Sequence, residues 1–381
     1  MTSAAAAGGG DGEADEAGGA ADTAAAGVGS GVVDDEARTH GLVDDRRLGA
    51  FLDERGLPGA GEALEVTFIT GGASNELFEV RRGGHRMALR RPPRIVPEGR
   101  NETMLREYRL LAALADTDVP HARALAVCED PDLMGGCFYL MEYVDGWSPM
   151  GGGGWPAPFD TDLEARPGLA FALVDGIAKL SRVDWRAKGL EGFGRPDGFH
   201  ERQVDRWMSH LAAVQFRDIP GLEVAAQWLR EHKPRHYEPG IMHGDYQFAN
   251  VMFRHGAPGR LAAIVDWEMA TVGDPLLDLG WVVQGWADPD EDRSTGSYVD
   301  MLGMPSRAEL LDYYARHSGR DVDDIDYYVI LARFKLAVVL EGGYARVVQG
   351  RADNPKMQAF GDVVLSLARR AAELASTTPL R

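Results

Sequence analysis

The sequence predicts an α+β protein of two lobes, with an antiparallel sheet and one main helix in the N-terminal lobe and a mainly helical C-terminal lobe. Three observations predict this fold. Residues 64–91 contain three strand-like segments separated by glycine-rich turns, then a helix and two more strands follow, and the chain after residue 168 is mainly helical in its periodicity. The length of 381 residues also exceeds what one hydrophobic core usually fills, so two lobes and a tail are expected.

Charge and composition limit the classes of partner. A formal net charge of -19 repels nucleic-acid phosphates and anionic lipid, so neither nucleic acid nor a membrane surface is an expected partner. No apolar run approaches the roughly 20 residues of a spanning helix, and the first residues lack the basic segment of a signal peptide. Cys128 and Cys137 lack the spacing of a metal site and are expected to be small buried hydrophobic residues. The expected location is the cytoplasm.

Residues 1–40 form a tail rich in Ala and Gly. This segment carries eight acidic side chains against one basic side chain, that of Arg38, and has almost no aromatic residue to anchor a core. We expect it to be disordered.

Residues 41–146 form the expected N-terminal lobe. A short helix begins near Leu42 and ends at the glycine and proline of residues 56–58, and the three strands of residues 64–91 follow. Residues 101–115 are predicted to be a helix whose apolar face includes Met104, Leu111 and Leu114, while Glu102 and Glu107 lie elsewhere on it. Two strands complete the lobe, one at 125–128 and one beginning at 137.

Residues 147–381 form the expected C-terminal lobe, which begins in a flexible segment rich in Gly and Pro. Amphipathic periodicity predicts helices at 168–183, 201–214, 222–232, 307–317 and 323–349. The sequence GDPLLDLGW marks a further helix start, with Asp274 as the N-cap and Pro275 at the first helical position.

The segment HGDYQFAN at 243–250 carries the strongest chemical signal. An apolar strand follows it and ends on a second acidic residue, Asp266. Phosphoryl transfer explains this spacing, because one carboxylate must orient the acceptor hydroxyl while an Asn and a second carboxylate hold magnesium on the nucleotide phosphates. Asp245 is therefore the candidate base, and Asn250 and Asp266 are the candidate metal ligands.

The segment TGGASN at 70–75 lies between two predicted strands. Small residues there let backbone N–H groups approach phosphate oxygens, although an ordinary hairpin turn would need the same glycines. Together with the downstream loop, the segment favours phosphate contact through Gly72, Ala73, Ser74 and Asn75.

The pattern H-G-D-x-x-x-x-N followed by I-V-D-W-E resembles the aminoglycoside phosphotransferase family, a branch of the protein-kinase-like fold. The segments LRRPP, GDPLLDLGW and FKLAVVLEGGYAR most resemble the kinase-like domain associated with acyl-CoA dehydrogenases 10 and 11. The resemblance implies a bilobal kinase-like fold, Asp245 as catalytic base, and magnesium bound by Asn250 and Asp266. It also implies that His243 is a structural member of the loop and that Asp278 supports the loop through hydrogen bonds.

The third strand reads M-A-L-R where a protein kinase has V-A-I-K, so Arg90 occupies the position of the lysine that holds the α- and β-phosphates. Arginine supplies a charge and a bidentate fork, but it is not equivalent to lysine. Glu107 is the expected ion-pair partner of Arg90, with Glu102 as the alternative. The alternative interpretation is that either residue is an ordinary glutamate on the solvent-exposed face of the helix.

The strand CFYLMEYV resembles the segment that joins the lobes of a kinase. Backbone groups from Glu142 to Val144 would then meet the adenine edge of ATP. The same residues also suit a central strand, and both interpretations can hold together.

The C-terminal helices offer weaker signals. Trp281 and Trp286 are expected in the core rather than at the acceptor. A basic group formed by Arg333, Lys335, Arg346 and Arg351 is interpreted as a solvated face paired with Glu341 and nearby acids. Its alternative role is recognition of an anionic acceptor such as a CoA thioester.

The expected function is transfer of the ATP γ-phosphate, with Mg as cofactor, to a hydroxyl of a small molecule. By resemblance the acceptor is a hydroxyacyl-CoA or a hydroxy acid; the alternative acceptor is an aminoglycoside or another antibiotic. A hypothesis of a different class is a nucleotide-binding pseudokinase that acts as a scaffold, favoured only by Arg90 in place of lysine. Nothing in the sequence predicts the oligomeric state.

Overall fold

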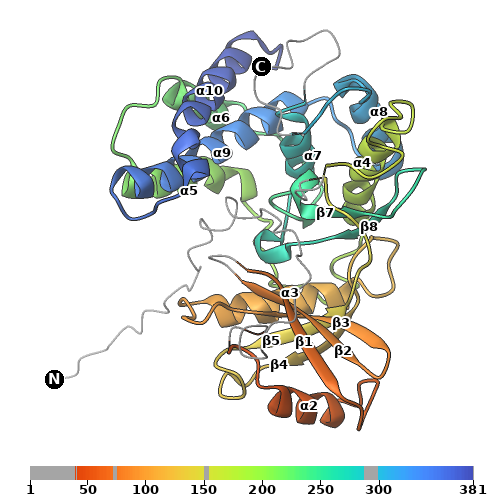
Figure 1. The fold of residues 1–381 in the computed structure, drawn as a ribbon. Helices are drawn as coiled ribbons and strands as arrows, with labels where there is room; N and C mark the ends of the chain where they lie inside the picture. Colours follow the sequence, from red (N-terminus) through yellow and green to blue (C-terminus); the bar gives the residue numbers. More distant parts are fainter. Residues whose placement is uncertain (1–38, 40, 72–74, 150–153, 287–298, 381) are drawn as a thin grey trace, which may run out of the picture.

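The N-terminal part of the protein is a five-stranded antiparallel sheet (Figure 1). The structure is a computed structural model that describes residues 39, 41–71, 75–149, 154–286 and 299–380; the predicted tail lies outside this range except for residue 39. The strands are β1 (Leu64–Gly71), β2 (Glu76–Arg82), β3 (His85–Arg91), β4 (Ala124–Cys128) and β5 (Phe138–Glu142). They lie in the order β1-β2-β3-β5-β4. This sheet and the mainly helical part that follows confirm the predicted α+β class.

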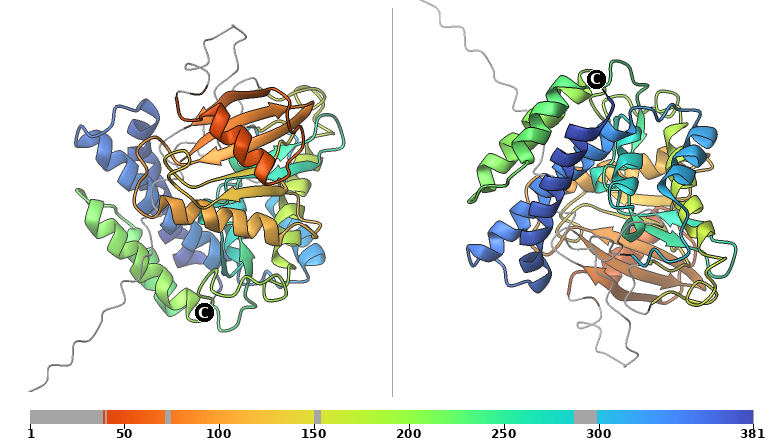
Figure 2. Two further views of the ribbon diagram at one scale, coloured as in Figure 1. Left: turned by 90° about the horizontal axis from the view of Figure 1, so that it is seen from below. Right: turned by 90° about the horizontal axis from the view of Figure 1, so that it is seen from above.

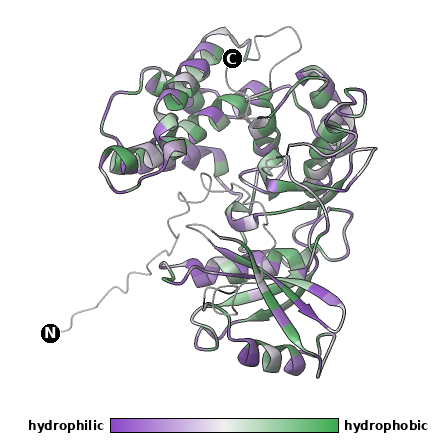
Figure 3. Ribbon diagram, viewed as in Figure 1, coloured by the Kyte–Doolittle hydropathy of each residue, from purple (hydrophilic) through white to green (hydrophobic). Residues whose placement is uncertain are grey.

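Helix α2 (Asp45–Glu54) covers the face of the sheet that points away from the rest of the protein (Figure 1). Asp44 caps it by accepting a hydrogen bond from the N–H of Arg47. The helix carries both hydrophilic and hydrophobic turns (Figure 3), and its buried Leu48, Phe51 and Leu52 join the apolar side chains of this sheet face in one cluster. Burial of an alternating strand pattern against one helix stripe fixes the register of the sheet.

Helix α3 (Arg100–Ala113) lies between the sheet and the C-terminal lobe (Figure 1). Met104, Leu111 and Leu114 are buried, as the periodicity predicts. The prediction that Glu107 lies away from the apolar face of this helix is wrong, however, because its side chain lies on the buried face and is only 1% exposed. Glu107 is spaced three residues from the buried Met104 and from the buried Leu110, so it lies on the same face of α3. A charged side chain is therefore buried beneath this helix.

The C-terminal part contains seven helices within the described residues. They are α4 (Pro167–Ser181), α5 (Phe199–Val214), α6 (Leu222–Glu231), α7 (Leu276–Val283), α8 (Arg307–Ser318), α9 (Ile325–Val348) and α10 (Pro355–Thr377). The sequence predicts all of them except α10. Helix α9 packs against α5, α6, α7 and α10, and α9 and α10 run side by side (Figure 2). None of the helices in the described ranges is long and apolar enough to cross a lipid bilayer.

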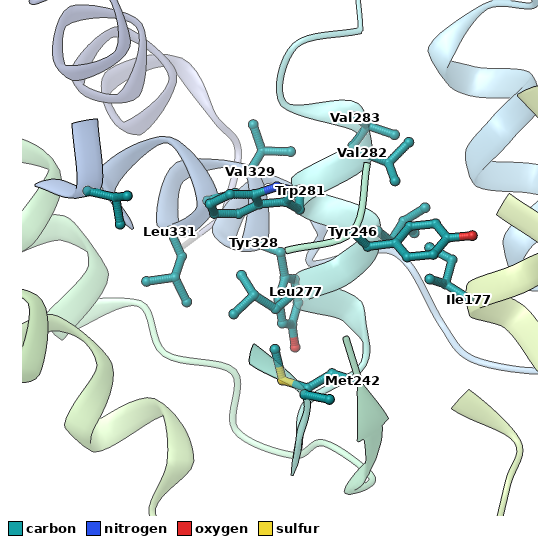
Figure 4. Packing of buried hydrophobic residues seen from close by; sticks show 14 of the residues in the cluster. Ile177, Met242, Tyr246, Leu277, Trp281, Val282, Val283, Tyr328, Val329 and Leu331 are labelled. Atoms are coloured by element: carbon teal, nitrogen blue, oxygen red, sulfur yellow. The ribbon is translucent and has the colours of Figure 1, made fainter. Parts of the chain in front are cut away.

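Two short antiparallel strand pairs lie between these helices and the sheet. Strand β6 (Gly240–Met242) pairs with β9 (Thr271–Gly273), and β7 (Val251–Phe253) pairs with β8 (Leu261–Ile264). The pairs hold the loop at 243–250 and the segment at 265–270 next to each other. Buried side chains of α7 and α9 pack directly behind them, with Leu277 and Trp281 of α7 beside Tyr328 of α9 (Figure 4).

The residues expected in the core are found there. Trp281 and Trp286 are 5% and 6% exposed. Cys128 and Cys137 are free and buried, and each thiol donates to a backbone carbonyl of the turn between β4 and β5. These expectations are confirmed.

Candidate active site

The loop between β6 and β7 presents Asp245. One oxygen of this carboxylate, Oδ1, accepts a hydrogen bond of 2.9 Å from Gln247 Nε2, and Oδ2 accepts one of 3.0 Å from Asn250 Nδ2. Asn250 Nδ2 also donates to the Asp245 backbone carbonyl at 2.8 Å. Because a carboxylate can accept about four hydrogen bonds, these two amides orient the group and leave capacity for a substrate hydroxyl.

The backbone of this loop is held from behind by α7. The Asp278 carboxylate accepts hydrogen bonds from the N–H of His243 at 2.6 Å and from the N–H of Gly244 at 2.8 Å. His243 Nε2 lies 2.9 Å from the Val265 carbonyl, so its ring also links the loop to the segment after β8. These contacts agree with the supporting roles implied for His243 and Asp278.

Burial changes the proton affinity of these groups. It lowers the pKa of His243 to about 4, so the ring is neutral near pH 7 and Nε2–H donates to Val265. It also raises the pKa of Asp245, an effect that the nearby Lys335 ammonium opposes. The pKa of Asp278 is raised by burial to about 6 against the two backbone N–H groups.

Asn250 and Asp266 lie on adjacent backbone segments, since the N–H of Val265 donates to the Asn250 carbonyl at 2.9 Å. Asn250 Oδ1 is buried and accepts no hydrogen bond within the described residues. Leaving such an oxygen unsatisfied costs about 1–3 kcal/mol, and Mg²⁺ is a hard cation that prefers oxygen ligands. Asp266 has a left-handed backbone, φ 62°, a conformation that is uncommon outside glycine. This amide oxygen and carboxylate therefore fit a magnesium ion.

Arg90 lies between two carboxylates. Its Nε is 2.9 Å from Glu107 Oε2 and its terminal nitrogen donates to Asp266 Oδ1 at 2.7 Å, while Tyr139 Oη donates to Glu107 at 2.7 Å. Burial alone would lower the pKa of Arg90, but the charges of Glu107 and Asp266 outweigh it and hold that pKa well above its ordinary value. The structure thus pairs Arg90 with Glu107, and Glu102 is exposed on the same helix.

Glu268, which the sequence does not single out, joins the two lobes two residues after Asp266. Its Oε2 accepts hydrogen bonds from Arg100 at 2.8 Å and from Asn75 Nδ2 at 3.3 Å. Burial, reinforced by the charge of Asp266, raises the pKa of Glu268. Of the predicted phosphate-binding segment, Asn75 is thereby connected to the Asp266 segment, whereas Gly72, Ala73 and Ser74 lie outside the described residues.

The end of β5 supplies the segment between the lobes. The N–H of Glu142 donates to the Arg123 carbonyl at 2.8 Å, and the Glu142 side chain is exposed. The N–H of Val144, two residues further on, finds no acceptor within the part of the chain that the structure describes. The backbone N–H of Val144 is therefore a candidate donor for a ligand.

The prediction that Arg333, Lys335, Arg346 and Arg351 form a solvated basic face is wrong. Arg333 and Lys335 are 8% and 5% exposed, and Glu341 is fully buried in an ion pair with Arg217. Only Arg346 and Arg351 of the group are exposed. Lys335 Nζ instead donates to the Gly244 carbonyl at 2.6 Å, directly behind Asp245. The four cations therefore form no common solvated surface.

Sequence comparison matches residues 65–321 to the APH family, described as a phosphotransferase enzyme family. Acyl-CoA dehydrogenase family member 10 of Mus musculus is 28% identical over 333 residues, which cover 84% of this chain and 30% of that protein. Acyl-CoA dehydrogenase family member 11 of Gallus gallus is 30% identical over 322 residues, 82% of this chain and 40% of that protein. The chain thus spans less than half the length of these curated relatives.

Solved structures give the same result. A Ralstonia eutropha protein described as a candidate aminoglycoside phosphotransferase has a TM-score of 0.75 and 30% identity, covering 87% of this chain and 98% of that one. The aminoglycoside phosphotransferase APH(4)-Ia, in a ternary complex with ADP and hygromycin B, has a TM-score of 0.55 at 12% identity, which indicates a likeness of fold alone; the match covers 86% of this chain and 98% of that one. These similarities confirm the resemblance inferred from the sequence.

Proposed function

The chain belongs to the APH family of phosphotransferase enzymes, and we propose that it transfers the γ-phosphate of ATP to a hydroxyl group of a small molecule. The observation that carries this proposal is the grouping of Asp245, Asn250, Asp266 and Arg90 at one junction between the lobes. The grouping provides a carboxylate for the acceptor, oxygen ligands for a metal and a cation for phosphate oxygens, which are the parts that phosphoryl transfer needs.

Asp245 acts on the acceptor. Its carboxylate accepts a hydrogen bond from the acceptor hydroxyl. The hydroxyl oxygen of the acceptor forms a bond to the γ-phosphorus while the bond between the γ-phosphorus and the β–γ bridging oxygen breaks. The hydroxyl proton passes to Asp245 and then to solvent, while ADP leaves with the bridging oxygen. The amides of Gln247 and Asn250 keep the carboxylate in place, so most of its contribution is positioning.

The nucleotide is held by groups from both lobes. Arg90 neutralises negative charge on the phosphates, and Glu107 keeps the guanidinium aimed at the site. Asn250 and Asp266 would hold Mg²⁺, which, when bound, neutralises charge on the phosphate oxygens. The adenine edge would bind to the backbone N–H of Val144 and the backbone carbonyl of Glu142. The phosphates would bind to the segment of Gly72, Ala73, Ser74 and Asn75.

The proposed acceptor is a hydroxyacyl-CoA or a free hydroxy acid. This choice is supported by the names of the curated relatives, which refer to acyl-CoA dehydrogenases. An aminoglycoside or another antibiotic is the alternative acceptor, and fold alone does not decide between them. A pseudokinase scaffold receives no support from Arg90, because this residue pairs with both Glu107 and Asp266.

The test is ADP release from ATP with a panel of hydroxyacyl-CoAs, hydroxy acids, aminoglycosides and macrolides. Asp245→Ala serves as the blank and is expected to keep the thermal stabilisation by a non-hydrolysable ATP analogue while transfer falls by at least about 100-fold. One acceptor class above the blank identifies the substrate. Wild-type turnover by Asp245→Ala would show that Asp245 is not the base.

A further inference from the structure

Helix α9 carries a buried cation that phosphoryl transfer, as described above, does not use. Most of this helix is apolar and buried, yet Lys335 lies in its middle with 5% exposure. Burial of a charged group costs several kcal/mol unless the group is paired, and methionine or leucine would fill the same space without that cost. The position therefore calls for a chemical reason.

The contacts of Lys335 lead to the loop that carries Asp245. Its Nζ donates to the Gly244 carbonyl at 2.6 Å and lies 4.8 Å from the ring centre of Trp281 and 5.4 Å from that of Trp207. The two indoles stabilise the charge through their faces and shield it from water. The Gly244 carbonyl belongs to the peptide group that leads directly into Asp245, so this hydrogen bond acts on the backbone of the proposed base.

A charge of opposite sign also binds the backbone of this loop. Asp278 of α7 accepts the N–H groups of His243 and Gly244, while Lys335 of α9 donates to the carbonyl of Gly244. Both polar groups of Gly244 are thus bound to charged side chains, which form stronger hydrogen bonds than neutral ones. The N–H belongs to the peptide group before Gly244 and the carbonyl to the peptide group after it, so one charged side chain holds each of the two planes. The second plane, which Lys335 holds, leads directly into Asp245.

We propose that Lys335 is a positioning residue for phosphoryl transfer, whose hydrogen bond to the Gly244 carbonyl keeps Asp245 aligned with the acceptor. This proposal rests on the role of Asp245 proposed above. Lys335 also lies outside residues 65–321, the part of the chain that matches the family. Catalytic geometry inside the matched region therefore depends on a helix beyond it.

Arg333 offers a matched control. It lies two residues away on α9, is 8% exposed and donates to the carbonyls of Gln284 and Arg370, which lie outside the loop at 243–250. Replacing either cation by methionine removes a buried charge from the same helix. A general loss of stability should therefore appear in both variants, whereas a loss of loop alignment should appear only in Lys335→Met.

The experiment compares Lys335→Met, Lys335→Arg and Arg333→Met with the wild type in ADP release from Mg²⁺-ATP, with water as acceptor where no other acceptor is found. We expect Lys335→Met to lower kcat about 10- to 100-fold with the KM for ATP within about twofold, because a small displacement of a catalytic group has effects of this size. Arg333→Met should keep kcat within about twofold. Lys335→Arg, which retains the charge and donors, should lie closer to the wild type than Lys335→Met.

Amide hydrogen exchange gives a readout that does not depend on activity. The peptide that contains residues 243–247 should exchange its amide hydrogens faster in Lys335→Met than in Arg333→Met. If Lys335→Met does not fold, Lys335→Arg replaces it, and the same peptide should then be protected about as well as in the wild type. Equal kcat and equal exchange in the two methionine variants would overturn the proposal. If the wild type releases no more ADP than Asp245→Ala, the proposed function fails, while the exchange comparison still tests the position of Lys335.

Discussion

Replacing Gly244 with alanine should move the proposed base without changing any functional group. Gly244 has φ +87°, and a Cβ built on it would lie 2.4 Å from the backbone carbonyl oxygen of Met269. Ordinary contact begins near 3.4 Å, so the two backbones must separate by about 1 Å. Met269 belongs to the segment that follows Asp266, so the separation would act on both proposed halves of the magnesium site.

Two effects contribute to the expected magnitude. The left-handed backbone costs an alanine about 1–2 kcal/mol relative to glycine. A displacement of about 1 Å in a catalytic group reduces the rate by up to about 100-fold. The steric effect therefore appears mainly in kcat, while the backbone effect appears in the free energy of unfolding.

Gly256→Ala separates these effects. Gly256 lies in the turn between β7 and β8 with φ +77°, and a Cβ there would meet nothing within 4 Å. Urea denaturation should show a loss of about 1–2 kcal/mol in both variants, with a further loss in Gly244→Ala. ADP release should fall by about 100-fold in Gly244→Ala and stay near the wild-type value in Gly256→Ala. Equal kcat in the two variants would show that the contact between residue 244 and Met269 does not control the position of Asp245.

Two other substitutions test the charges around the site. Arg90→Lys should lower the free energy of unfolding by about 3 kcal/mol in urea and raise the KM for ATP, because one ammonium cannot span Glu107 and Asp266 and leaves a buried carboxylate unpaired; a variant with both wild-type values would contradict this. The pKa of His243 is lowered from 6.5 to about 4. As the pH falls from 6.5 towards 4, the His243 ring therefore binds a proton in the unfolded chain but not in the folded one, and the folded state loses stability. In urea titrations, the free energy of unfolding should fall between pH 7 and pH 5 by about 2 kcal/mol less in His243→Gln than in the wild type. An equal fall in both proteins would show that the ring is not held neutral.

Local signals were sufficient for most of the fold. The Gly83 and Gly84 turn separates β2 from β3, and Pro275 stands at the start of α7, so both boundaries follow from residue chemistry. Helix α10 is absent from the prediction although Phe360, Val364 and Leu367 repeat at helical spacing and are buried. Its signal was present in the sequence and could have been found by the same periodicity.

The site was predicted less completely, because its contacts join residues far apart in the chain. Asp245, Asn250 and Asp266 share one local motif and could be predicted together. Arg90 and Asp266 are 176 residues apart, and Lys335 and Gly244 are 91 residues apart. Residue type does not reveal whether a helical cation faces water or a backbone carbonyl, and this is why Lys335 was assigned to a solvated face.

The contacts of α3 bear on how the site is kept assembled. Towards the sheet, Glu107 pairs with Arg90; towards the C-terminal lobe, Arg100 pairs with Glu268, and Arg106 donates to the Ala270 carbonyl at 2.9 Å. Protein kinases can control activity by moving the equivalent helix away from its lysine. Here the same movement would break charged hydrogen bonds to both lobes together, each worth about 1.5–3 kcal/mol. A comparable switch in this protein would therefore have to break the pair of Arg100 with Glu268 as well as the pair of Glu107 with Arg90. The pairing of Glu268 with Arg100 thus helps to keep Glu107, and through it Arg90, in place.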